Sequence, residues 1–439
     1  MMEIVALIMF VALFALILTG VQVAFALMAV ATVGGLVVFG DSVFHQFVGK
    51  IEDVATNFIL AAVPLFVFMG AMLERSGIAE DLFSAIRIWT RKLRGGVAVG
   101  TVLMAIVFAA STGVVGATES LIGLLAIPPM LQQGYKKSLI SGTICAGGSL
   151  GTVIPPSIII ILLGPLADVS VGDLMAGMII PGLLLGFFYL TYVLVASAMG
   201  GAGPRLEHDP ADDMSLSEKL VLSAKALLPP LVLISAVLGS IVTGAASPTE
   251  AAGIGAACAV VLAALHGKLN LRMLWHSLVQ TLSVTTMIMF IVLGGSLFTG
   301  VLLGTGALWN VQDAISAMDV PTWVLILTFL GIVFAAGFFL EWISILLIFV
   351  PIFMPFIKAA GVDPVWFSVL VLITVQTSYM TPPMAPAIFY LRGVAPKEIT
   401  LKHMYAGVMP FVIIQFVLLG IVAVFPVTVL WLPSILLGF

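Results

Sequence analysis

The chain has 439 residues, of which 62% are hydrophobic and 9% are charged, and its formal net charge is −4. Soluble domains carry about 25% charged residues, so this composition excludes a soluble globular protein and indicates a membrane protein with many spans. The few charges lie mostly in short segments between long apolar runs, which gives no indication of a nucleic-acid surface.

The first 94 residues are expected to form scaffold helices and one interfacial helix. A helix needs about 20 apolar residues to span a bilayer, so residues 1–39 hold two spans and Asn57 to Leu73 holds a third. Residues 78–92 show apolar side chains at helical spacing with charged side chains opposite, which predicts an amphipathic helix lying in the interface. The basic residues Arg91 to Arg94 mark this side as cytoplasmic.

Residues 95–133 lie between two basic clusters and are expected to begin and end on the cytoplasmic side. Their middle, Ser111 to Ser120, is small and polar and contains Glu119. Two crossing helices would place this turn outside the membrane, whereas a re-entrant hairpin would place it at the midplane. Charge placement fits both arrangements, and the broken helix that follows favours the hairpin.

Paired prolines interrupt two apolar runs, at Pro155-Pro156 and at Pro382-Pro383. Proline removes a backbone donor and breaks a helix, so each run is predicted to be two half-helices joined by an unwound turn. Irregular backbone at membrane depth is tolerated only where protein covers it or where it lines a site. Matching broken helices in two halves therefore indicate a transporter's binding site. Two proline-kinked helices without a ligand are the alternative.

The two halves of the chain are a repeat. Ile106 to Ala110 recurs identically as Ile332 to Ala336, and Pro128, Gly134 and Pro155 each have a counterpart 227 positions later. The first copy lies between basic residues, whereas the second begins beside an acidic residue and ends its hairpin at a loop with one lysine and one aspartate. Opposite orientations follow, which is the inverted-repeat plan of secondary transporters.

The expected fold class is an all-α polytopic membrane protein with a scaffold and a transport domain. Residues 95–170 and 321–395 are each expected to hold one re-entrant hairpin and one broken helix of the transport domain. The remaining segments are expected to form the scaffold: 1–94, 171–320 and 396–439. A second interfacial helix is expected at residues 307–318, where the weakly amphipathic pattern has no basic residue.

Polar side chains at membrane depth are the candidates for chemistry. A carboxylate there costs at least about 2.5 kcal/mol, so Glu119 and Glu341 need partners. Small cations bind carboxylate, hydroxyl and carbonyl oxygens, and two oxygen-rich clusters fit a sodium ion. The first cluster is Ser111, Thr112, Gly151 and Thr152, and the second is Glu341, Ser378 and Thr381. The alternative is that these hydroxyls bond only to their own helices.

The N-termini of half-helices carry partial positive charge, which suits an anionic substrate between the two clusters. The candidate substrate contacts are Thr118, Glu119, Pro155, Pro156, Ser157, Pro382 and Pro383. The sequence contains no nucleotide-binding motif, metal-ligand spacing or nucleophile–base arrangement. We therefore expect no organic cofactor and no enzyme activity, although an intramembrane enzyme using Glu119 and Glu341 is a less favoured alternative.

Five motifs occur in a fixed order: Ala110 to Glu119, Gly134-Tyr135, Gly151 to Ser157, Ser247 to Ala251 and Thr381 to Pro383. Together they resemble the large membrane subunit of tripartite ATP-independent periplasmic (TRAP) transporters, over nearly the whole chain. The resemblance implies an elevator-type, sodium-coupled importer of a small organic acid in the bacterial inner membrane. It also implies two partners, a small four-helix membrane subunit and a periplasmic substrate-binding protein. The family's sodium sites lie at the hairpin tips and broken-helix turns.

Two departures from the family pattern affect the tips. Many relatives have a serine-rich first tip and an aspartate in the second, whereas this chain has Ser-Thr-Gly at residues 111–113 and Glu341. The first tip is similar to the subgroup associated with mannitol or chloroaromatic compounds. The alternative to a TRAP subunit is a self-sufficient elevator symporter of the sodium/divalent-anion type. The sequence disfavours this alternative, because it shows no extra helices that would replace a partner subunit.

Overall fold

The computed structural model describes residues 2–113, 116–201, 214–307 and 320–438. Every regular element in these ranges is helical, and eight helical stretches are long and apolar enough to cross a membrane. The prediction of an all-α polytopic membrane protein is confirmed. The second interfacial helix, expected at residues 307–318, lies outside the described residues except for Ala307.

The chain begins with five helices: α1 (Met2–Leu18), α2 (Val23–Phe39), α3 (Val43–Thr56), α4 (Ala62–Arg75) and α5 (Ile78–Thr90). The helices α1 and α2 are the two predicted first spans, and the third predicted span is α4 with the short helix η2 (Phe58–Ala61) before it. Sequence analysis assigns no helix to α3, because three charged residues interrupt its apolar pattern. The spacing of Val43, Phe47 and Val54 is nevertheless helical, and this was the signal for it.

The amphipathic helix predicted at residues 78–92 is present as α5. Its apolar side chains Ile78, Leu82 and Ile86 are buried, and the helix packs against α6 (Gly96–Thr112) and α11 (Leu216–Val242). The Trp89 Nε1 atom also donates a hydrogen bond to Ser223 Oγ of α11 at 2.7 Å. The apolar face of α5 is therefore covered by protein rather than by lipid.

Each half of the chain contains a helical hairpin, a broken helix and a long helix, in the same order. The first half contains α6, α7 (Ala117–Gln132), α8 (Lys137–Ser149), η3 (Leu150–Thr152), α9 (Ile158–Ala167) and α10 (Val171–Ala196), which continues into η4 (Ser197–Gly201). The second half contains α15 (Thr322–Ala336), α16 (Trp342–Ala359), α17 (Pro364–Met380), α18 (Pro386–Val394) and α19 (Leu401–Val424). Between them lie α11, α12 (Pro248–Leu265) and α13 (Leu271–Gly304), and α20 (Val427–Leu437) follows.

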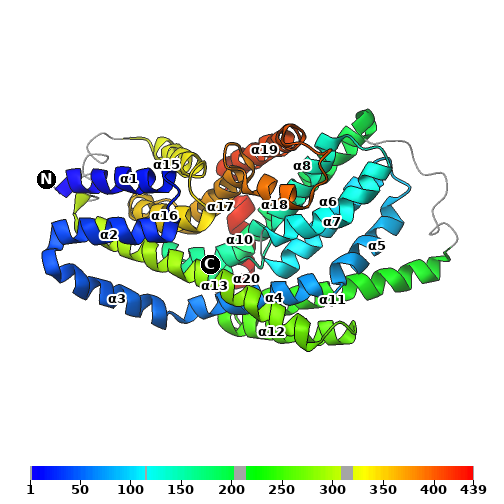
Figure 1. Cartoon of the computed structure of the whole chain (residues 1–439), viewed down its shortest axis with the longest axis horizontal. Helices are drawn as coiled ribbons and strands as arrows, with labels where there is room; N and C mark the ends of the chain where they lie inside the picture. Colours follow the sequence, from blue (N-terminus) through cyan, green and yellow to red (C-terminus); the bar gives the residue numbers. More distant parts are fainter. Residues whose placement is uncertain (1, 114–115, 202–213, 308–319, 439) are drawn as a thin grey trace.

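The two halves match in detail. The helices α7 and α16 end at Gln132 and Ala359, which are 227 positions apart. Gly134 and Gly361, also 227 apart, both have left-handed φ angles, of 68° and 69°. The Pro155-Pro156 and Pro382-Pro383 bonds are both cis. In Figure 1 the hairpin α6–α7 and the hairpin α15–α16 lie toward opposite ends of the long axis, as inverted repeats require.

The helices pack in two groups. One group contains α2, α4, α11, α12 and α13, of which α4, α11 and α12 lie along the lower edge in Figure 1. The other contains the broken helices with α10, α19 and α20, since α8 packs on α19 and α10 packs on α20. The two groups meet where α13 contacts α16 and where α4 and α11 contact α6, and α5 packs between α6 and α11.

Two glycines allow the closest helix contact of the second group. A β-carbon at Gly142 of α8 would overlap the carbonyl oxygen of Gly407 in α19, and a β-carbon at Gly407 would overlap the carbonyl of Ser138. Helices in membranes associate through such small residues, because the backbones can then approach and gain van der Waals contact. The contact holds α19 directly against the first half-helix of the first repeat.

One ion pair joins the two repeats at the side that the charge pattern places outside the cell. Lys358, near the end of α16, donates to Asp168 Oδ2 at 2.8 Å, at the end of α9. This hydrogen bond and charge hold the pKa of Asp168 below its usual value. Lys358 is the lysine at the end of the second hairpin, and its charge is balanced by this partner.

We predict that Gly142→Ala lowers the stability of the protein by about 1–3 kcal/mol, the usual cost of forcing an extra carbon into a packed contact. The apparent midpoint of thermal unfolding of the purified protein measures this effect. Gly420→Ala is the matched control, because it lies on α19 with nothing within 4 Å of its added β-carbon. Equal midpoints for the two variants would contradict the close contact between α8 and α19.

Candidate functional site

A cavity of about 400 Å³ lies between the two hairpins and the two broken helices. The first repeat contributes Gly113 at the tip of the first hairpin and Gly151 in the broken helix. The second repeat contributes Glu341 at its tip and Ser378 at the end of α17. The cavity therefore brings together members of both oxygen-rich clusters predicted from the sequence, although Gly151 lies 190 positions before Glu341 and 227 positions before Ser378.

The first cluster surrounds the turn of the first broken helix. Ser111 Oγ and Thr112 Oγ1 donate to the Phe108 carbonyl at 2.8 and 3.0 Å, and Thr152 Oγ1 donates to the Ser149 carbonyl at 2.8 Å. The hydroxyls thus donate hydrogen bonds within their own helices, as expected if they bind no ion. Each hydroxyl oxygen still has lone pairs, so these bonds are compatible with a cation on the opposite side.

The first hairpin tip packs directly on the unwound turn. A β-carbon at Gly113, whose φ is +61°, would lie 2.6 Å from the Pro156 carbonyl oxygen and 3.4 Å from the Ser157 Cα atom. Ser157 is fully buried, and its Oγ has no hydrogen-bond partner among the described residues. Pro155, Pro156 and Ser157 therefore lie immediately behind the tip rather than among the residues that line the cavity.

In the second cluster the hydroxyls also donate to carbonyls of their own helix. Ser378 Oγ donates to the Val375 carbonyl at 2.8 Å, and Thr381 Oγ1 donates to the Thr377 carbonyl at 2.6 Å. A β-carbon at Gly337 would overlap Ser378 Oγ, so the second tip also packs on its broken helix. Glu341 is the N-cap of α16, is partly buried and lines the cavity, whereas Thr381 does not line it.

Glu119 lies behind the first tip and not in the lining of the cavity. Its carboxylate is fully buried, and Oε2 accepts a hydrogen bond from the Gly116 backbone N–H at 2.6 Å. The other oxygen, Oε1, and the Tyr379 hydroxyl lie near each other without a hydrogen bond of good geometry. Glu119 therefore caps the N-terminus of α7 and holds the tip, and its predicted contact with substrate stays a prediction.

The remaining predicted substrate residues lie around the cavity. Thr118 lines a small adjoining space beside Gln280 of α13. Pro382 and Pro383 do not line the cavity, but their neighbours Met384 and Pro386 do. The second diproline turn thus lies beside the cavity, and Met384 and Pro386 rather than the two prolines are the residues of this segment that line it.

Sequence analysis also missed the aromatic and scaffold residues of the cavity. Trp342, Tyr379 and Tyr390 line it from the second repeat, and Gln280 and Met287 line it from α13. No motif marks Gln280, Met287, Trp342 or Tyr390, because their proximity follows from helix packing. The signal for Tyr379 was its position beside Thr381, within the second broken segment.

A buried polar pair lies where the repeats meet. Gln376 Nε2 donates to Ser149 Oγ at 3.3 Å, and both side chains are fully buried. The two residues are 227 positions apart, which is the spacing of the repeat, so they are equivalent positions in contact. Such contact occurs only at the axis that relates the two repeats.

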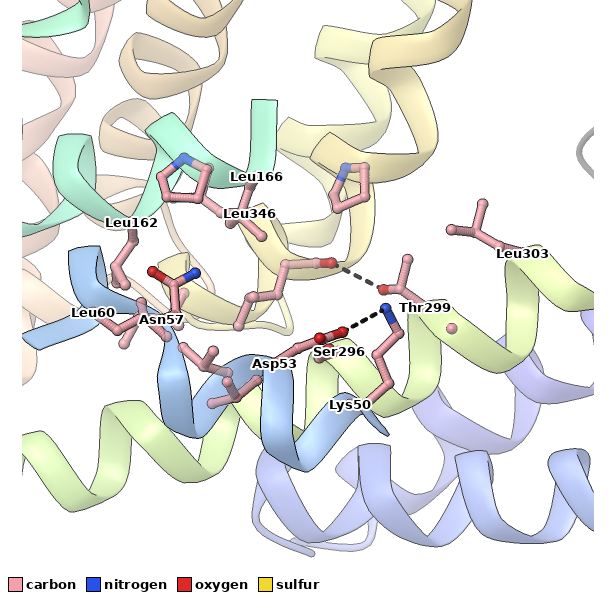
Figure 2. A pocket seen from close by; sticks show the side chains of 17 residues that line it. Lys50, Asp53, Asn57, Leu60, Leu162, Leu166, Ser296, Thr299, Leu303 and Leu346 are labelled. Atoms are coloured by element: carbon pink, nitrogen blue, oxygen red, sulfur yellow. Dashed lines mark hydrogen bonds and ion pairs between the residues drawn. The ribbon is translucent and has the colours of Figure 1, made fainter. Parts of the chain in front are cut away.

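A second cavity, of about 390 Å³, lies between the two groups of helices. Figure 2 shows Lys50 and Asp53 of α3 on one side, paired at 3.5 Å, with Leu162, Leu166 and Leu346 of α9 and α16 facing them. On the same boundary a β-carbon at Gly295 of α13 would lie 2.7 Å from Leu347 Cβ of α16. The two groups are thus tightly packed in one place and separated by a cavity in another.

Comparison with known proteins identifies a family over most of the chain. The family model described as tripartite ATP-independent periplasmic transporter, DctM component, matches residues 10–428. The C4-dicarboxylate TRAP transporter large permease protein DctM of Pseudomonas aeruginosa is 30% identical over 403 residues, which cover 91% of this chain and 92% of that protein. The sialic acid TRAP transporter large permease protein SiaM of Vibrio cholerae is 28% identical and covers 90% of each chain.

The chain is also similar to a longer relative and to a solved structure. The isethionate TRAP transporter permease protein DctMQ of Oleidesulfovibrio alaskensis is 26% identical over 94% of this chain, which matches 64% of that longer protein. The crystal structure of the YdaH transporter of Alcanivorax borkumensis superposes with a TM-score of 0.64 at 15% identity, covering 94% of this chain and 98% of that one. At this identity the superposition shows a shared fold alone.

We predict that Glu119→Ala lowers the apparent stability by about 1–3 kcal/mol, because the buried Gly116 N–H loses its acceptor. Glu119→Gln should retain most of the stability, since its amide oxygen can still accept that hydrogen bond. Glu250→Ala is the control, because Glu250 caps α12 in the same way at an exposed position where water can replace it. If the thermal midpoints of Glu119→Ala and Glu250→Ala fall equally, Glu119 does not hold the tip.

Proposed function

Because the chain belongs to the family of the DctM component of tripartite ATP-independent periplasmic transporters, we propose that it is the large membrane subunit of a sodium-coupled importer of a small organic acid in the bacterial inner membrane. The observation that supports this function best is the cavity between the two tips, which joins oxygen-rich turns from both repeats. Irregular backbone at membrane depth occurs where it lines such a site.

Sodium is the coupling ion best suited to these turns. Hydroxyl and carbonyl oxygens and one carboxylate, Glu341, surround the two tips, and sodium is a hard cation that such oxygens bind. The donors of Ser111, Thr152 and Ser378 are used within their helices, which leaves their oxygens as acceptors. Among the described residues no group of three or more His, Cys, Asp or Glu side chains could hold a metal ion, which fits a weakly held ion of single charge.

The contacts between helices support separate roles for the two packed groups. We assign the hairpins and broken helices to a moving body, and α2, α4, α11, α12 and α13 to a scaffold. The packing of α10, α19 and α20 on the broken helices favours placing them in the moving body. The sequence instead predicts a scaffold role for residues 171–320, which include α10, and for residues 396–439. An elevator motion would then slide the body past α13.

Two partners complete the proposed transporter. The isethionate relative is named as a single DctMQ protein and is longer than this chain, which supports a second membrane component beside this one. The expected small four-helix subunit would be that component, and a periplasmic binding protein would deliver the substrate.

We predict that the reconstituted protein, with its small subunit and binding protein, takes up substrate only under an inward sodium gradient. Proteoliposomes loaded with potassium and diluted into sodium or potassium buffer measure this dependence. Equal uptake in potassium, with or without a proton gradient, would refute sodium coupling. Full uptake without the binding protein and small subunit would instead favour the self-sufficient symporter.

We predict that joining α13 to α16 stops transport. Gly295→Cys with Leu347→Cys, in a background with Cys145 and Cys258 replaced, places two β-carbons close enough for a disulfide after a small shift. Oxidation should lower uptake at least about tenfold and reduction should restore it, since the linked body cannot slide.

The control joins two helices of the scaffold. A β-carbon at Gly255 of α12 would lie 2.9 Å from Val237 Cγ2 of α11, so Gly255→Cys with Val237→Cys should cross-link without loss of uptake. If the α13–α16 disulfide forms and uptake is as fast as in the chemically reduced protein, the elevator assignment is wrong.

A further inference from the structure

A pair of opposite charges lies on one wall of the second cavity, the one of about 390 Å³ between the two groups of helices. Lys50 and Asp53 of α3 both line this cavity, and Lys50 Nζ lies 3.5 Å from Asp53 Oδ2 (Figure 2). Their side chains are 42% and 70% exposed, so both charges are accessible to a ligand. The cavity therefore offers one positive and one negative group side by side.

The helix α13 indicates the depth of this pair in the membrane. Arg75, at the end of α4, donates to Gln280 of α13 on the cytoplasmic side, whereas a β-carbon at Gly300 of the same helix would lie 3.4 Å from Lys50 Cε. Gln280 and Gly300 are 20 positions apart, which is about 30 Å along a helix and close to the thickness of the hydrocarbon core. Lys50 therefore lies near the level of the headgroups of the outer leaflet.

The wall opposite the charged pair is apolar. Leu162 and Leu166 of α9 and Leu346 of α16 form it (Figure 2), and among the described side chains that line the cavity there is no aromatic ring. Leu166 lies two positions before Asp168, whose ion pair with Lys358 is on the outer side. The leucines therefore continue inward from the level of the headgroups, where an acyl chain can bury apolar surface against them.

The rim of the cavity is continuous with apolar surface that faces the bilayer. Leu303 of α13 lines the cavity and is 42% exposed. On α3 the side chains of Val48 and Ile51, close to Lys50 in sequence, are also exposed. Exposed apolar surface of this kind contacts lipid in a membrane protein, so a lipid can enter the cavity while its headgroup stays at the surface.

The two charges favour a zwitterion over a simple anion. Asp53 would repel a carboxylate that approached Lys50, because like charges at such a short distance oppose each other. A headgroup with a phosphate and an ammonium group satisfies both residues, since the phosphate accepts from Lys50 Nζ and the ammonium donates to the Asp53 carboxylate. Basic residues between membrane helices are known to bind lipid headgroups in this way.

From these features we propose that the cavity binds one phospholipid of the outer leaflet. Its zwitterionic headgroup, of the phosphoethanolamine type, lies at Lys50 and Asp53, and one acyl chain lies along the leucines of α9 and α16. The lipid then contacts α3 and α13 on one side and α9 and α16 on the other, and so it joins the two groups of helices. This inference depends neither on sodium coupling nor on the identity of the substrate.

Competition between two lipids tests the proposal. The complex of the large and small subunits is purified in detergent, stripped of lipid and offered equal amounts of phosphatidylethanolamine and phosphatidylglycerol, and bound lipid is measured by native mass spectrometry. The first lipid bound should be phosphatidylethanolamine, by about fivefold, because one charge at a membrane surface contributes about that factor. Glycerophosphoethanolamine, the same headgroup without acyl chains, should not displace it at millimolar concentration.

Charge variants locate the headgroup. Asp53→Lys leaves two basic residues and should reverse the preference toward the anionic phosphatidylglycerol. Lys50→Asp with Asp53→Lys exchanges the two charges and should restore the preference for phosphatidylethanolamine. Lys225→Glu is the control, because this lysine lines a different surface cavity on α11, and it should leave the preference unchanged.

A larger side chain on the opposite wall locates the acyl chain. Leu166→Trp fills part of the cavity and should lower the binding of phosphatidylethanolamine without changing either charge. Leu231→Trp is the control, because Leu231 of α11 is 46% exposed and does not line the cavity.

The outcomes separate this inference from the proposed function. Equal binding of the two lipids by the unmodified protein, or an unchanged preference in folded Asp53→Lys protein, would overturn the proposal. Displacement of phosphatidylethanolamine by millimolar succinate or phenylacetate would identify the cavity as an entry site for substrate and would also overturn it. The proposed function is decided separately, by uptake in a sodium gradient.

Discussion

The backbone that is interrupted inside the membrane must be covered by protein, and the rest of the architecture depends on this constraint. Each of the two hairpin tips contacts its unwound turn through a glycine residue. Gly113 packs on the Pro156 carbonyl, Gly116 lies under the Tyr390 ring, and Gly337 packs on Ser378. Because each hairpin tip serves as the cover of an unwound turn, the hairpin and the broken helix form one unit. The central cavity is the space left where the two units meet.

The helical class, the two breaks and their repetition were predictable from the sequence because their signals are local. These signals are the diprolines, an identical pentapeptide and a set of landmarks repeated 227 positions later. The helix α3 was not predicted because Lys50, Glu52 and Asp53 interrupt a short apolar pattern. The burial of α5 against other helices was not predicted either, since an amphipathic pattern is the same whether lipid or protein covers it. Which group of helices α10 and α19 join is decided by contacts such as Gly142 with Gly407, which no local pattern reports.

The candidate site was predictable as two turns but not as a set of facing side chains. Gly151, Glu341 and Ser378 line the cavity as expected. Glu119 was expected there because a buried carboxylate needs a partner, and the partner proved to be its own helix N-terminus. A sequence distinguishes such a cap from a ligand only when the neighbouring backbone is known.

The contact between Ser149 and Gln376 has a consequence for the history of the chain. A residue on the axis of a duplicated structure meets its own copy, so immediately after duplication the same side chain stood on both sides. The pair now consists of one serine and one glutamine, and the glutamine amide donates to the serine hydroxyl at 3.3 Å. The halves have therefore become complementary instead of equivalent. A gene that carried the first half twice would place a serine at both positions, and the amide that donates this hydrogen bond would be absent.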